Sequence, residues 1–305
     1  MVTSRIRYSI VLSAIIQLAL GAFTAHPYDG RVFLAAGYSV AHGNSPYVPV
    51  DVSGVFGKEL FPDPITGIGY PPPWSLVLAI VCLASYNLFP NLIFYNFAMK
   101  VPIVIVNILL ALLVGRAAFS ETSDNAVSDR ATRFMLFNPY VIYSTAIWGQ
   151  FDTASVLLML LSILMFSRGR RCPSAIALGG AIALKVLPIA LAPLLIICEK
   201  KRAGWLKAVQ YATLTAAAVA AAFAPFVVFG WSIEPVIDNW NVHFIRVGGF
   251  SPMYLLILFG IDVPTGSWEM LGYLWIPALA LVYYVISRKP NVKLPDLLLS
   301  ALATM

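Results

Sequence analysis

Residues 92–114 read LIFYNFAMKVPIVIVNILLALLV, an apolar stretch of 23 residues. A helix that crosses the hydrocarbon core of a bilayer needs about 20 mainly apolar residues, so this stretch is long enough to span a membrane. Spans are also expected at residues 8–23, 74–89, 134–147, 152–166, 205–229 and 271–287. Because a spanning segment must satisfy its own backbone hydrogen bonds, these stretches predict helices and an all-α polytopic membrane protein.

The composition of the whole chain agrees with this fold class. Of 305 residues, 60% are apolar and only 11% are charged, and the mean hydropathy is +0.82. Soluble domains carry about 25% charged residues, so this chain has too few to solvate a globular surface. We expect a single transmembrane domain over residues 1–305, with a C-terminus that is either incomplete or ends in a short span.

The net charge of +6 comes from basic residues that lie in short clusters at the ends of apolar stretches. The clusters are Arg5/Arg7, Arg168/Arg170/Arg171, Lys200/Lys201/Arg202 and Arg288/Lys289. This pattern is typical of cytoplasmic loops and indicates topology rather than a nucleic-acid partner.

The first apolar stretch predicts a retained anchor with a cytoplasmic N-terminus, because no A-x-A cleavage site follows it. Residues 26–72 then form a long first outer loop, with a short interfacial helix expected over 31–41. Residues 231–251 form a second outer loop. A plasma membrane or endoplasmic reticulum location follows, with any active site on the outer or luminal face.

Two features of this topology depend on helix length. Only about 27 residues separate the basic clusters at Arg168 and Lys200, which predicts a short re-entrant hairpin with Lys185 at its apex, its arms too short to cross the bilayer. The second feature is a conflict of parity, that is, between the number of membrane crossings and the side on which the basic residues would lie. Two crossings between Pro72 and Arg116 would put the basic residues of 116–133 outside, so either one stretch does not cross or this loop breaks the charge rule.

Asp29 follows the first span, where a carboxylate lies at the outer face of the membrane. An apolar wall can tune such a group to act as a general base, although a solvated loop aspartate is equally compatible with its position. Trp148-Gly149-Gln150-Phe151-Asp152 interrupts an apolar region with an amide and a carboxylate, which indicates either a functional site or a helix connector.

Three basic side chains are candidates for binding a lipid phosphate. Lys185 stands in an otherwise apolar run, where an unpaired ammonium is costly unless it reaches water, a carboxylate or an anion. His243 and Arg246 lie in the second outer loop, and a guanidinium suits bidentate phosphate contact. The sequence has no metal-ligand cluster, P-loop, dinucleotide signature or nucleophile elbow.

Four motifs in this order resemble the GT-C superfamily of membrane glycosyltransferases. They are Asp29-Gly30-Arg31-Val32-Phe33 with Gly43-Asn44-Ser45-Pro46-Tyr47; Tyr70-Pro71-Pro72-Pro73; Asn138-Pro139 with the 148–152 motif; and Lys185-Val186-Leu187-Pro188. The resemblance covers about residues 1–200 and is strongest to glycosylphosphatidylinositol mannosyltransferases and bacterial polyprenol-phosphate-mannose-dependent transferases. It implies a helical bundle with a long first outer loop and short broken helices.

The resemblance also implies roles for residues. Asp29 corresponds to the catalytic acid of the first outer loop, and a second acid two residues earlier is replaced by Pro27. A metal held by two carboxylates is therefore doubtful, and a divalent cation stays an open alternative, with Asp63 a possible substitute. Lys185, Arg246 and His243 are the expected ligands of the donor phosphate. The residues expected to bind sugar or acceptor are Arg31, Tyr47, Gln150 and Asp152.

The implied reaction is an inverting transfer of a hexose, taken as mannose, from a polyprenyl- or dolichyl-phosphate sugar to a lipid or glycan hydroxyl. Two alternatives from the residues alone are a secondary transporter or lipid flippase, which also uses broken helices, and a non-catalytic membrane subunit. The sequence carries no paired repeat of the kind that many transporters have.

Overall fold

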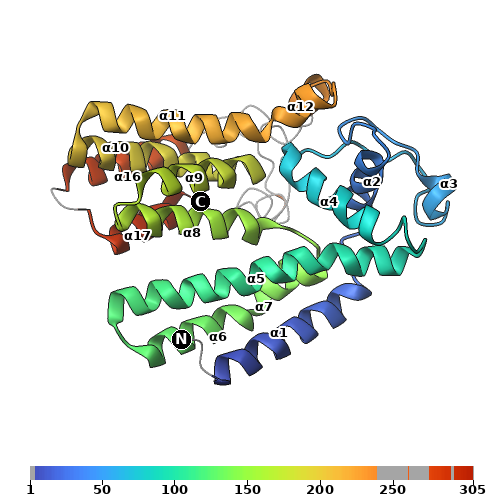
Figure 1. Cartoon of the computed structure of the whole chain (residues 1–305), viewed down its shortest axis with the longest axis horizontal. Coiled ribbons are helices and arrows are strands. Elements are labelled where there is room, and N and C mark those ends of the chain that lie inside the picture. Colours follow the sequence, from blue (N-terminus) through green and yellow to red (C-terminus); the bar gives the residue numbers. More distant parts are fainter. Residues whose placement is uncertain (1–3, 239–259, 261–274, 290–291, 305) are drawn as a thin grey trace.

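The computed structural model describes residues 4–238, 260, 275–289 and 292–304. In this part of the chain there are helices and no β-strand, and three segments are long and apolar enough to cross a membrane. They are α1 (Ser4–Ala22), α5 (Leu92–Thr122) and Trp205–Val228, which joins α11 (Trp205–Ala222) and α12 (Ala224–Val228). The predicted class, an all-α polytopic membrane protein, is confirmed (Figure 1).

Helices α1 and α5 pack side by side in opposite directions. Near the start of α5, the Asn96 amide donates to the carbonyl oxygen of Gly21 at the end of α1, at 3.0 Å. Farther back along α1, the hydroxyl of Ser13 donates to the carbonyl oxygen of Leu136 in α6 (Asn125–Leu136), at 2.7 Å. The turn between α5 and α6 therefore lies at the same end of the molecule as the start of α1 (Figure 1).

This arrangement removes the conflict of parity. Helix α4 (Pro72–Ala84) has only 13 residues. At 1.5 Å per residue it is about 20 Å long, less than the hydrocarbon thickness of about 30 Å. One outward crossing by α1 and one return by α5 bring residues 116–133 back to the side of Arg5 and Arg7. The 116–133 loop therefore obeys the charge rule, and the stretch at 74–89 is not a full span.

A buried amide joins four elements in the middle of the bundle. Asn107 of α5 donates to the side chains of Gln17 in α1 and Thr145, each at 2.7 Å. Its own oxygen accepts from Thr153 at the start of α8 (Asp152–Ser167), at 2.6 Å. Polar side chains in a membrane interior are stable when they are paired, so this network fixes how these elements sit against one another.

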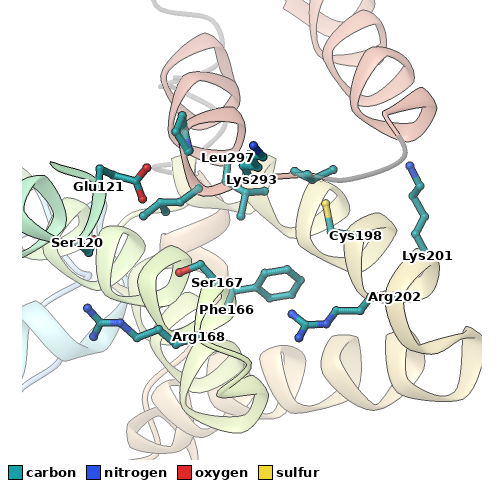
Figure 2. Close-up of a pocket in the computed structure, with 13 residues that line it drawn as sticks. Ser120, Glu121, Phe166, Ser167, Arg168, Cys198, Lys201, Arg202, Lys293 and Leu297 are labelled. Atoms are coloured by element: carbon teal, nitrogen blue, oxygen red, sulfur yellow. The ribbon is translucent and has the colours of Figure 1, made fainter. Parts of the chain in front are cut away.

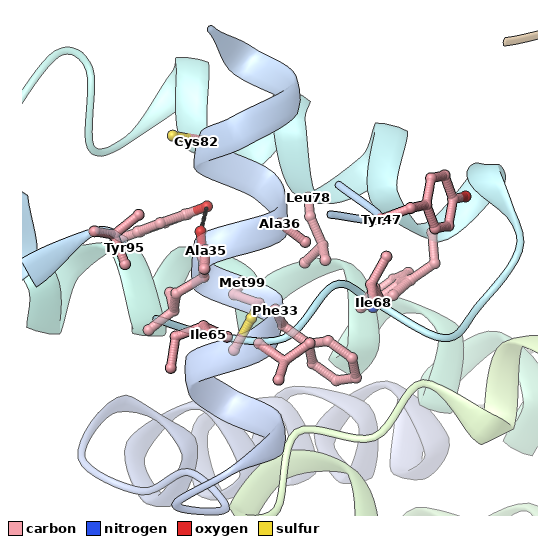
Figure 3. Packing of buried hydrophobic residues seen from close by; sticks show 14 of the residues in the cluster. Phe33, Ala35, Ala36, Tyr47, Ile65, Ile68, Leu78, Cys82, Tyr95 and Met99 are labelled. Atoms are coloured by element: carbon pink, nitrogen blue, oxygen red, sulfur yellow. Dashed lines mark hydrogen bonds between the residues drawn. The ribbon is translucent and has the colours of Figure 1, made fainter. Parts of the chain in front are cut away.

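The end of the molecule that carries Asp29 is built on α2 (Asp29–Ala41), which begins two residues before the helix expected over 31–41. Eight of its residues are buried, so α2 forms part of the core and not only an interfacial surface. It packs against α4, and Tyr95 of α5 donates from its hydroxyl to the carbonyl oxygen of Leu34 at 3.1 Å (Figure 3). Gly37 permits this approach, because a β-carbon there would lie 2.8 Å from the carbonyl oxygen of Leu78.

The expected re-entrant hairpin is present. Helix α9 (Arg171–Leu184) has 14 residues and α10 (Leu191–Ala203) has 13, joined through Lys185 and the short 3-10 helix η2 (Leu187–Ala190). The far ends of the two arms meet, because Arg171 pairs with Glu199 at 2.6 Å. Both basic clusters therefore lie at one end, and Lys185 lies at the tip.

The prediction of a continuous span over 134–147 is wrong. Helix α6 ends at Leu136, and a new helix begins as α7 (Pro139–Val141) and continues as the π-helix η1 (Ile142–Ile147). The break has a local cause: Asn138 caps the new helix by accepting from the backbone N–H of Val141, and proline disfavours helical backbone before it. The remaining described helices are α3 (Ser53–Phe56), α16 (Trp275–Arg288) and α17 (Leu294–Thr304).

We predict that Ser123, in the turn between α5 and α6, faces the same side of the membrane as the N-terminus. In a cysteine-free background, Ser123→Cys should react with a membrane-impermeant maleimide only when the cytoplasmic side is exposed. Lys58→Cys in the first outer loop is the matched control and should react only from the opposite side. Labelling of both positions from one side would contradict the antiparallel crossing of α1 and α5.

Candidate active site

Asp29 opens α2, and its carboxylate is held by the 148–152 motif. The indole Nε1 of Trp148 and the amide Nε2 of Gln150 each donate to Asp29 Oδ2 at 2.7 Å. The Asp29 side chain keeps 26% of its surface exposed, and both of these hydrogen bonds fall on the same carboxylate oxygen. Trp148 and Gln150 come 119 and 121 residues after Asp29 in the sequence, yet both meet its carboxylate.

His26 completes the contact between these two segments. Its ring stacks on the indole of Trp148 with centroids 4.4 Å apart, and its backbone N–H donates to the carbonyl oxygen of Trp148 at 3.0 Å. The ring Nδ1 accepts the backbone N–H of Asp29 at 3.2 Å. An Nδ1 that accepts carries no proton, so its 3.5 Å separation from Asp29 Oδ2 is proximity and not an ion pair.

Gly149 allows the loop between these donors to turn. Its φ is +102°, a backbone conformation that favours glycine. A β-carbon there would also lie 2.8 Å from Nζ of Lys100, a fully buried lysine of α5. The Lys100 ammonium donates to the carbonyl oxygen of Ile147 at 3.4 Å and, within the described residues, has no ion-pair partner. A buried cation therefore lies directly behind the loop that holds Asp29.

A second charged group adjoins Gln150. The ammonium of Lys185, at the tip of the hairpin, pairs with the carboxylate of Asp152 in the first turn of α8. It lies 5.5 Å from the centre of the Tyr70 ring, just before α4. Burial raises the pKa of the Tyr70 phenol, and the negative charges of Asp152 and Asp29 raise it further, so the phenol stays a neutral hydrogen-bonding group. Tyr70 thus connects the Lys185 pair with the Asp29 side of the site.

On the other side of His26 there is a cavity of about 600 Å³. Its walls come from the end of α1, the start of α2, the start of α5 and residues 59–61, and most are apolar. Arg31 borders it, with Nε donating to the carbonyl oxygen of Pro27 at 2.6 Å and a terminal nitrogen donating to that of Leu60 at 3.3 Å. The guanidinium therefore braces the first outer loop beside the cavity.

The remaining residues expected at the site are placed apart from Asp29 or are not described. Tyr47 is buried in the core, where its ring stacks on Phe226 at 5.0 Å. Asp63 is exposed in the first outer loop. His243 and Arg246 lie outside the described residues. No group of three His, Cys, Asp or Glu side chains that could hold a metal ion gathers within the part that the structure describes.

His26 and Lys100 are the residues that sequence reasoning missed, and Trp148 was noticed only as part of its motif. Lys100 could have been identified from the sequence, because it is the one charged residue in the apolar stretch 92–114. The same argument identified Lys185, which also lies among apolar residues. His26 could not have been identified in this way, since its role depends on stacking against a residue 122 positions away.

The comparison with family models decides which class of protein this site serves. The model of glycosyltransferase family 87 matches residues 69–305, more than three quarters of the chain. The chain belongs to glycosyltransferase family 87. No curated protein matches the sequence.

Membership makes the protein a transferase with a sugar donor and an acceptor, and the matched residues contain most of the site. Tyr70, the 148–152 motif and Lys185 all fall within them. Asp29 and His26 precede the matched region and reach it through their contacts with Trp148 and Gln150.

We predict that Gly149→Ala lowers glycosyl transfer by about tenfold, because a β-carbon at positive φ costs about 1–2 kcal/mol and the loop must shift to relieve it. The measurement is transfer of radiolabelled sugar by membranes with equal amounts of inserted protein. Gly54→Ala is the control, since a β-carbon at Gly54 meets nothing within 4 Å. Equal activity of both variants would show that the loop conformation does not matter.

Proposed function

We propose that this glycosyltransferase moves a hexose, most simply mannose, from a polyprenyl-phosphate sugar to the hydroxyl of a lipid or glycan acceptor, with inversion and with Asp29 as the general base. The observation that carries the proposal is the pair of hydrogen bonds from Trp148 and Gln150 to one oxygen of Asp29. They hold the carboxylate in one orientation and leave its other oxygen for the acceptor. The GT-C resemblance and the position of Asp29 after α1 support a site on the outer or luminal face.

In the proposed step, the acceptor oxygen attacks the anomeric carbon of the donor sugar while Oδ1 of Asp29 takes the hydroxyl proton. The bond from the anomeric carbon to the phosphate oxygen breaks, and the electron pair leaves with the polyprenyl phosphate. Because a lipid phosphate is already a good leaving group, the protein contributes mainly by positioning the reactants and balancing charge.

Lys185 is the proposed partner of the departing phosphate. Its ammonium lies 5.5 Å from the centre of the Tyr70 ring, and Asp152 holds it in the absence of a ligand. An anionic donor competes with Asp152 for the same cation, which frees Asp152 to bind sugar hydroxyls. Gln150 keeps its hydrogen bond to Asp29, and its amide oxygen is the atom proposed to bind a sugar hydroxyl. His243 and Arg246 stay proposed phosphate ligands on sequence grounds.

The apolar cavity beside His26 and Arg31 is the proposed acceptor side of the site. In this proposal the acceptor hydroxyl approaches from the cavity and meets Asp29, and the donor phosphate lies toward Lys185, on the opposite face of the anomeric carbon. Tyr47 has a structural role in this proposal, because its ring is enclosed by the core.

We predict that Asp29→Asn lowers transfer by about a hundredfold to ten-thousandfold, the range that a positioned general base contributes. The amide keeps an acceptor oxygen for Trp148 and Gln150, so the protein should insert and unfold like the wild type. Radiolabelled transfer from polyprenyl-phosphate mannose is the assay, and Asp63→Asn is the exposed control, expected to be fully active. An Asp29→Asn protein with normal activity would overturn the proposal.

We predict that Lys185→Met raises the KM for the polyprenyl-phosphate donor about tenfold or more and changes kcat less, because removing a charged hydrogen-bond donor costs about 1.5–3 kcal/mol. Steady-state kinetics with the acceptor saturating separate the two constants. Lys207→Met, at an exposed lysine of α11, is the matched control and should leave the donor KM unchanged. An unaltered donor KM in Lys185→Met would remove this residue from the donor site.

A further inference from the structure

A second cavity lies at the basic end of the bundle, away from Asp29. It has a volume of about 890 Å³ and is lined by the ends of α5, α8 and α10 and by the start of α17 (Figure 2). The glycosyl transfer proposed above assigns it no role. Its position places it on the same side of the membrane as the N-terminus, because the turn between α5 and α6 lies there.

Positive charge dominates the lining of this cavity. Arg168, Lys201, Arg202 and Lys293 border it, and Glu121 is the one acid that does. Figure 2 shows Arg168 and Arg202 on opposite sides of Phe166. Arg168 follows the last residue of α8, and Arg202 belongs to α10. Basic residues from separate helices therefore line the same cavity.

Two other carboxylates near this end of the bundle are paired with cations outside the lining of the cavity. Glu199 pairs with Arg171 at 2.6 Å, and Asp296 pairs with Lys289 at 2.5 Å. Among the described residues, Arg168 and Arg202 have no ion-pair partner. Like charges that meet without a counter-ion repel one another, so an anion in the cavity would lower the energy of this arrangement.

Lys201 holds two of the helices at this end together, and apolar side chains complete the lining of the cavity. The Lys201 ammonium donates to the carbonyl oxygen of Ser287 at 3.0 Å, which ties α10 to the end of α16. Phe166, Leu294 and Leu297 form an apolar wall beside the guanidinium groups. A cavity that is lined by both cations and apolar side chains suits an amphiphile better than a soluble anion.

We propose that this cavity binds the phosphate headgroup of an anionic lipid from the leaflet on the side of the N-terminus. Basic pockets between membrane helices on the cytoplasmic side are suited to such headgroups, because each cation near the surface adds to the attraction. The guanidinium groups of Arg168 and Arg202 bind the phosphate oxygens, since planar guanidinium groups match phosphate geometry. The start of the acyl chains lies along Phe166 and Leu297.

The test measures binding of a fluorescent short-chain phosphatidylglycerol to the full chain purified in neutral detergent, in the absence of any sugar donor. The wild type should bind it, whereas the double variant Arg168→Gln/Arg202→Gln should bind roughly tenfold more weakly or worse. Lys207→Gln removes one positive charge from the same basic end outside the cavity and should bind like the wild type. Equal affinity of the double variant and the wild type would overturn the proposal.

Two further arms identify the chemistry of the ligand. A phosphatidylcholine with the same chains should compete poorly, because its headgroup carries no net charge. Inorganic phosphate should also compete poorly; displacement of the lipid by phosphate at equal concentration would make this a site for a soluble anion and refute the lipid. Circular dichroism of the double variant shows whether weaker binding comes from loss of the site or from loss of the fold. In a folded protein, Arg168→Lys/Arg202→Lys should bind more tightly than the glutamine double variant, because the positive charges are kept. Because no transfer is measured, the outcome does not depend on the role proposed for Asp29.

Discussion

The buried amide of Asn107 is the contact on which the rest of the molecule depends. Its nitrogen and oxygen are paired with side chains of α1, η1 and α8, so an outward shift of any of these elements leaves a polar group unpaired among apolar neighbours. Two of its partners, Thr145 and Thr153, flank the 148–152 motif. The amide therefore fixes both ends of the loop whose Trp148 and Gln150 hold Asp29, and the position of a surface carboxylate is set from the centre of the bundle.

The two ends of the bundle are chemically different, and helix length explains the difference. At the end that carries Asp29, short helices and an enclosed α2 leave space between the long spans, and polar groups gather there. At the other end the helices finish in basic clusters, whose carboxylates pair with only some of the cations.

Much of the fold followed from the sequence, because span length and the placement of charge are local properties. The hairpin around Lys185 was predictable from the spacing of its basic clusters, and Asp29 and Gln150 were identified through their motifs. What the sequence did not reveal depends on contacts between distant segments. The stack of His26 on Trp148, the burial of α2 and Tyr47, and Lys100 behind Gly149 all require the packed bundle. The break at Asn138 and Pro139 was visible in the sequence, but apolar composition alone suggested a continuous span there.

The hairpin formed by α9 and α10 also fixes how far Lys185 lies from the basic end of the bundle. Its two outer ends are fastened together by Arg171 and Glu199, so the distance of Lys185 from that fixed point equals the length of an arm. Each residue added to an arm would move the lysine by about 1.5 Å and turn it by about 100° around the helix axis. The number of residues in each arm therefore sets how far Lys185 lies from the basic end, whereas an insertion before Arg171 or after Ala203 would leave that distance unchanged.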